Sequence, residues 1–82
     1  MNSKIIDNLV GWYGTVAILL AYALLSFGIF TADNLLYQIL NCTGALGIVY
    51  ISLKKKVYQP GILNIIWALI AGLTIIKILI KI

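Results

Sequence analysis

Polar side chains interrupt two long apolar stretches of the sequence at helical spacing. Gln38 and Asn41 are three residues apart, and so are Asn64 and Trp67, which places each pair on one face of a helix. An amide buried in hydrocarbon without a partner is costly, so both faces should meet protein or a water-filled cavity. Their chemistry is hydrogen bonding, either between helices or to a solute. Thr43 lies at a similar depth to Asn41 and joins these candidates.

Acid–base and metal chemistry have few candidates in this chain. It contains two acidic residues, Asp7 and Asp33, and no histidine. Both acids flank the apolar stretches, so no carboxylate or imidazole proton relay is predicted within them. No nucleophile–base pair or metal site can be assembled either, and the one cysteine, Cys42, cannot form an intrachain disulfide. We therefore predict neither an enzyme nor a bound cofactor.

Composition indicates that the outside of this protein faces lipid. Of the 82 residues, 63% are hydrophobic and 10% are charged, against about 25% charged in ordinary soluble domains. The mean hydropathy is +1.12. The net charge of +4 comes partly from a Lys54–Lys56 run between apolar segments, which is typical of a topology signal rather than of nucleic-acid binding. We predict a bilayer environment and no nucleic-acid partner.

Three segments are long and apolar enough to span a bilayer, which takes about 20 residues each. They cover about residues 9–30, 34–53 and 61–80. Asp33 or Asn34 could cap the second helix, and Pro60 suits the first turn of the third. A spanning barrel needs at least about eight strands, which do not fit. The prediction is an all-α integral membrane three-helix bundle, formed by residues 1–82 as one membrane domain.

Lysine counts predict the orientation of the bundle. Three spans place Lys4 and Lys54–Lys56 on one side, and Lys77 and Lys81 on the other. The positive-inside rule then favours a cytoplasmic N-terminus in a multi-pass cell-membrane protein, such as one of a bacterial inner membrane. Trp12 and Tyr13 are expected to anchor the first helix at the membrane interface.

Small residues predict where the helices pack, because membrane helices associate through close backbone approach. They lie at helical spacing on the first two segments. The predicted packing residues are Gly14, Ala17, Ala21, Gly28, Gly44 and Gly47.

The residues from Leu36 to Ala45, and those from Ile62 to Trp67, resemble the second and third helices of the SemiSWEET and PQ-loop (MtN3-like) transporters. Those proteins are small three-helix half-transporters. The resemblance implies that Asn64 faces a central cavity and binds solute, such as a sugar. The first segment lacks that family's proline hinge, and Ile48 stands where the family has a solute-holding tryptophan. The sequence also resembles a family of small bacterial three-helix membrane proteins through Gly11–Gly14, Ala21–Tyr22, Asn41 and Asn64–Trp67.

These observations lead to two hypotheses of function. In the first, two copies form a symmetric homodimer that moves a small neutral solute by alternating access, because one such protomer can hardly enclose a path. The solute-binding residues are then predicted to be Asn64, Asn41, Trp67, Gln38 and Thr43. In the second, the chain is an accessory or scaffold subunit whose polar faces bind partner helices.

Overall fold

The computed structural model describes residues 3–81 and consists of three α-helices. They are α1 (Ser3–Ser26), α2 (Leu35–Lys54) and α3 (Tyr58–Lys81). Each is long and apolar enough to cross a membrane. The all-α class and the three predicted spans are therefore confirmed, and the chain is a small multi-pass membrane protein.

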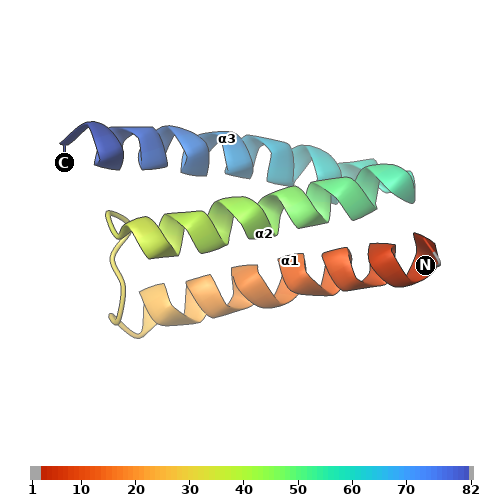
Figure 1. Ribbon diagram of the computed structural model, residues 1–82, viewed down its shortest axis with the longest axis horizontal. Helices are drawn as coiled ribbons and strands as arrows, with labels where there is room; N and C mark the ends of the chain where they lie inside the picture. Colours follow the sequence, from red (N-terminus) through yellow and green to blue (C-terminus); the bar gives the residue numbers. More distant parts are fainter. Residues whose placement is uncertain (1–2, 82) are drawn as a thin grey trace.

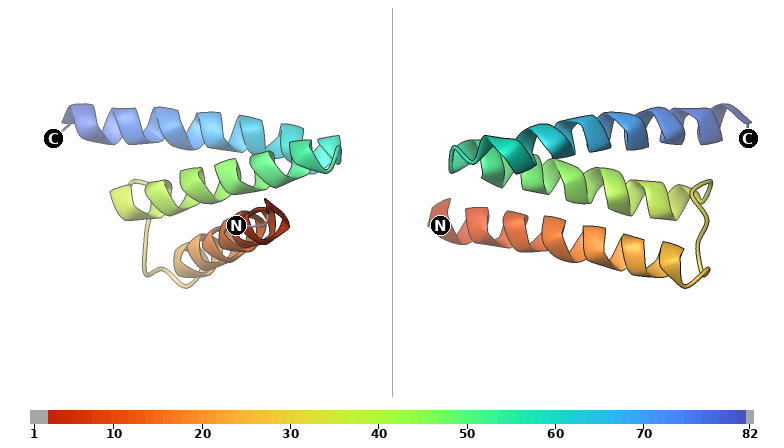
Figure 2. Two further views of the ribbon diagram at one scale, coloured as in Figure 1. Left: turned by 45° about the vertical axis from the view of Figure 1, so that its right-hand side comes forward. Right: turned by 180° about the vertical axis from the view of Figure 1, so that it is seen from behind.

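The helices run antiparallel, and α2 lies between α1 and α3 (Figures 1 and 2). Both outer helices pack on α2, whereas within the described chain no Cα atom of α1 comes within 8 Å of one of α3. The N-terminus and the α2–α3 connection share one end of the bundle, and the C-terminus and the α1–α2 connection share the other (Figure 1). The two outer helices are thus separated by α2.

The first helix begins and ends earlier than predicted. It starts at Ser3 and includes Asp7, whose charge is compensated by Lys54 of α2. It ends at Ser26 because Gly28 adopts φ +75°, which closes the helix. The Gly28 amide donates to the Leu25 carbonyl and the Ile29 amide to the Leu24 carbonyl, the bond pair of a Schellman motif.

The second and third helices begin close to the predicted positions. Asn34 caps α2, its Oδ1 accepting a bond from the Tyr37 amide at 3.1 Å. At the other end of α2, Lys56 takes the left-handed position with φ 59°, and the Val57 amide bonds the Ser52 carbonyl. Pro60 falls in the first turn of α3, where the helix needs no amide donor from it.

Glycines bring α1 and α2 into backbone contact. A Cβ placed on Gly14 would lie 2.6 Å from the Gly44 carbonyl oxygen, and one on Gly47 would lie 3.0 Å from the Val10 carbonyl oxygen. Ala17 and Ala21 are buried along the same seam. Gly28 is the exception among the predicted packing residues, because it lies in the connection, where no described atom would come within 4 Å of an added Cβ. Its role is to end α1.

Small residues also line the contact between α2 and α3. Ala45, Ala68 and Ala71 are buried there, and Gly61 faces the Ser52 side chain. Cys42 lies at this seam, with its sulfur 3.8 Å from the Ala68 carbonyl oxygen. The thiol is thus a small packing group with a weak hydrogen bond.

Candidate functional site

A groove of about 420 Å³ lies between α1 and α3 and has α2 as its floor. Its walls are Thr15, Ile18 and Leu19 of α1 and Leu63, Asn64 and Trp67 of α3, with Ile48 of α2 beneath them. Sites for small molecules commonly have volumes of about 300–1,000 Å³. The groove exists because α2 separates the outer helices, and no described Cα atom of α1 lies within 8 Å of one of α3.

The groove continues towards the end of the bundle that carries Lys54–Lys56. A second hollow of about 240 Å³ shares Thr15 and Ile48 with the groove, and Asp7, Trp12 and Lys55 also line it. The groove therefore extends from near the middle of the helices towards one membrane surface.

Asn64 supplies the main polar group of the groove. Its Nδ2 donates to the Pro60 carbonyl oxygen at 2.8 Å, one helical turn back. An asparagine amide has two N–H donors and a carbonyl oxygen, and within residues 3–81 the second donor and the oxygen form no bond. Asn64 can thus both donate to and accept from a bound group.

Trp67 lies beside Asn64 on the groove wall and is held by Asn41. Its indole Nε1 donates to Asn41 Oδ1 at 2.8 Å, a bond that joins α3 to α2. Asn41 is only 8% exposed and is absent from the groove lining. Asn41 thus lies at the α2–α3 seam, where it holds the Trp67 ring, and it does not line this groove.

The structure places the other two predicted site residues away from the groove. Gln38 is buried, and its Nε2 donates to the Ala32 carbonyl at 2.7 Å, which ties the α1–α2 connection to α2. Thr43 faces the opposite side of the α1–α2 pair. Its hydroxyl donates to the Ile39 carbonyl at 2.8 Å, so the Tyr13 hydroxyl, 2.7 Å away, donates to Thr43.

This contact also adds to the role of Tyr13. Because α1 begins at Ser3, Tyr13 lies ten residues, or about 15 Å, into the helix. Tyr13, predicted to anchor the first helix at the interface, also forms a hydrogen bond between α1 and α2.

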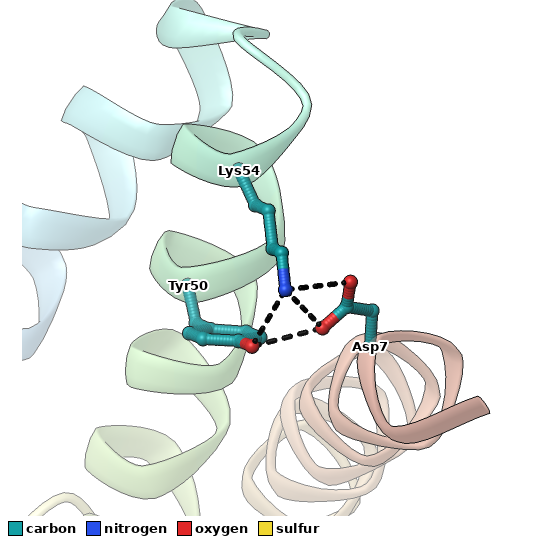
Figure 3. Close-up of polar contacts among 3 residues, drawn as sticks. All are labelled: Asp7, Tyr50 and Lys54. Carbon is teal, nitrogen blue, oxygen red and sulfur yellow. Dashed lines mark hydrogen bonds and ion pairs between the residues drawn. The ribbon is translucent and has the colours of Figure 1, made fainter. Parts of the chain in front are cut away.

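A charged cluster that the sequence did not predict joins α1 to α2 near the membrane surface (Figure 3). Lys54 Nζ lies 3.0 Å from Asp7 Oδ2, and the Tyr50 hydroxyl donates to Asp7 Oδ1 at 2.8 Å. The ammonium also lies 5.5 Å from the centre of the Tyr50 ring. The four-residue spacing of Tyr50 and Lys54 places both on one face of a helix. Their shared partner Asp7 is 43 and 47 positions away, so the spacing alone could not indicate the cluster.

Replacing Asp7 with asparagine is expected to lower the thermal stability of the detergent-solubilised protein by only a few degrees. The change leaves Lys54 without its anion, but an exposed ion pair is worth little. Thermal unfolding followed by circular dichroism measures the effect, and the difference from wild type should shrink in 1 M salt. Asp33→Asn is the matched control, since Asp33 forms no ion pair within residues 3–81. Equal effects of the two substitutions would rule out a specific contribution of the cluster.

Comparison with known proteins gives one match. Searches of curated proteins and of solved structures found no significant match, and nothing found links the chain to the SemiSWEET or PQ-loop proteins. One protein-family model matches residues 8–81, which include α2, α3, α1 from Asn8 onward and all residues that line the groove. The chain therefore belongs to the family that this model describes, and its own residues 3–81 form three helices long and apolar enough to span a membrane.

Proposed function

We propose that this protein is one half of a homodimeric membrane transporter for small uncharged solutes. The observation that carries the proposal is the groove with the free amide groups of Asn64 on its wall. One protomer leaves this groove open, because no described Cα atom of α1 comes within 8 Å of one of α3. A second copy related by a two-fold axis would close it and face its own Asn64 towards the first.

The groove chemistry defines the class of solute. Aliphatic side chains and the Trp67 ring form most of its surface, and Asn64 supplies hydrogen bonds. Among residues 3–81, no ionisable side chain lines the central part, so a charged solute would lose its hydration without an ionic partner. We therefore propose a small neutral solute with few hydrogen-bonding groups, since a sugar would leave many hydroxyls unpaired.

The resemblance to SemiSWEET transporters supports the same site through two positions. Asn64, which matches that family's solute-binding asparagine, lies on the groove wall, and Ile48 forms the groove floor at the position of the family's tryptophan. The solute would cross the membrane as the two protomers rock around this site.

We also propose a cytoplasmic N-terminus, because the lysine bias favours it. Labelling of an engineered terminal cysteine in intact cells would test this orientation.

The first experiment is the protomer count by native mass spectrometry of the protein released from nanodiscs. A dimer is the expected result. A monomer under these conditions would overturn the transporter proposal, since a single protomer has an open groove.

Asn64→Leu is expected to reduce solute flux about tenfold while leaving the dimer intact. The change removes one hydrogen bond to the solute, worth about 1–1.5 kcal/mol. Stopped-flow light scattering of proteoliposomes, with glycerol, acetamide and glucose as probes, measures the flux. Thr43→Val is the matched control, because Thr43 lies on the opposite face and should leave flux unchanged. No protein-dependent flux of any probe, or equal flux in Asn64→Leu and wild type, would contradict the proposal.

A second function, an accessory or scaffold subunit, is supported by the internal bonding of the polar residues. Asn41 bonds Trp67 and Gln38 bonds Ala32, so neither needs a solute. The open groove would then receive a helix of another protein, with Asn64 as its hydrogen-bonding partner. Co-purification from native membranes distinguishes the two functions: a stoichiometric foreign subunit supports the scaffold, and a homodimer alone excludes it.

A further inference from the structure

The end of the bundle opposite Lys54–Lys56 contains another, more polar hollow of about 610 Å³. It lies where the α1–α2 connection meets the C-terminal part of α3 (Figure 1). Its polar lining consists of Asp33, Gln38, Thr74, Lys77 and Lys81. Since the helices have the length of membrane spans, this end lies at the level of the lipid headgroups.

The lysines of this hollow have no anionic partner among the described residues. Lys77 and Lys81 are four residues apart and line the same hollow, yet within residues 3–81 neither forms an ion pair. Lys54, by contrast, is paired with Asp7. Asp33 is the only acid in the described lining and makes no ion pair with a described residue either. Among the described lining residues, two cations and one carboxylate give a net positive charge.

The remaining lining suits a molecule with an apolar part. Ile70 and Ile78 extend the same face of α3, and Ile70 lies about two turns deeper in the membrane than Lys77. Gln38 uses one of its N–H donors on the Ala32 carbonyl, so its second donor is free for a ligand. The Thr74 hydroxyl donates to the Ile70 carbonyl, so it offers a ligand an acceptor rather than a donor.

We propose that this hollow binds the phosphate headgroup of an anionic phospholipid. Each ammonium offers three donors to the phosphate oxygens, and basic hollows between membrane helices are suited to such headgroups. Ile70, which lies deeper than the lysines, would contact the upper part of the acyl chain, which a free phosphate ion lacks. The site does not depend on the transport proposal, because it shares no lining residue with the groove.

The test compares lipid retention by wild type and two double variants, Lys77→Gln/Lys81→Gln and Lys55→Gln/Lys56→Gln. Both variants lose the same charge, but at opposite ends of the bundle. Native mass spectrometry from mixed phosphatidylglycerol and phosphatidylcholine counts the lipids that stay bound. We expect the Lys77/Lys81 variant to retain about tenfold less phosphatidylglycerol, and the Lys55/Lys56 variant to resemble wild type. Equal losses in both would show an effect of net charge alone and overturn the site.

Three further measurements identify the ligand. Asp33→Asn removes the acidic side chain of the described lining and should increase phosphatidylglycerol retention, whereas Lys77→Arg/Lys81→Arg should preserve it. Loss of retention in the arginine variant, despite unchanged helical content, would contradict a charge-based site. Inorganic phosphate at millimolar concentration should not displace the lipid. Its displacement by phosphate would show a free-anion site instead and overturn the assignment to a lipid.

Discussion

Gly14→Ala is expected to destabilise the protein by about 1–3 kcal/mol, the usual cost of overpacking a tight contact. The new Cβ would lie 2.6 Å from the Gly44 carbonyl oxygen and 3.0 Å from the Ile48 amide nitrogen. Both are backbone atoms, so no side chain can rotate away, and α1 must move off α2. In lipid this close approach is itself the source of helix association. Unfolding by sodium dodecyl sulfate in micelles, followed by circular dichroism, gives the free energy.

Other glycines of this chain supply graded controls. The first contacts of a Cβ on Gly44 would be at 3.0–3.1 Å, and those of one on Gly11 at 3.5 Å with the Ile51 side chain. A Cβ on Gly72 would meet no described atom within 4 Å, so Gly72→Ala should cause no loss and gains helix propensity. The expected order of destabilisation is Gly14, Gly44, Gly11, Gly72. A Gly72 variant as unstable as the Gly14 variant would show that the loss comes from something other than the α1–α2 contact.

Sequence reasoning predicted the three helices well, and the bounds of α2 and α3 within three residues, but it missed both ends of α1. The three apolar stretches were clear because a membrane span demands uninterrupted length. The start of α1 was missed, since Asp7 looked like a boundary when its partner Lys54 was unknown. The end was missed because Gly28 was interpreted as a packing residue at helical spacing, whereas its positive φ terminates the helix.

The candidate site was predictable only where a residue's position on its own helix decides its surroundings. Asn64 and Trp67 were placed on one face, and the structure puts both on the groove wall. The same reasoning could not predict the contacts of Gln38, Asn41 and Thr43, because these contacts depend on how the neighbouring helices lie beside α2. Periodicity gives no crossing geometry, and so it could not reveal that α2 is the central helix and has neighbours on two sides.

The hydrogen bond between Trp67 and Asn41 is expected to stabilise the α2–α3 contact by about 1 kcal/mol, as measured by a double-mutant cycle. Trp67→Phe leaves the buried Asn41 amide without its partner, at a cost of about 1–3 kcal/mol. Asn41→Leu should lower the free energy of unfolding by less. Trp67 is 47% exposed, so its indole N–H can turn towards other polar groups. The variant with both changes should be more stable than the sum of the two losses predicts.

A second cycle provides the control for this coupling and bears on the site. Thr43 bonds Tyr13 and not Trp67, so Thr43→Val and Trp67→Phe should be additive within about 0.5 kcal/mol. If the Asn41 and Trp67 effects were also additive, their bond would contribute nothing to folding. Asn41 would then be free to bind solute, as the sequence alone suggested, and Asn41→Leu should reduce flux as strongly as Asn64→Leu. A coupling of about 1 kcal/mol instead assigns Asn41 to the helix contact and leaves Asn64 as the polar group that meets the solute.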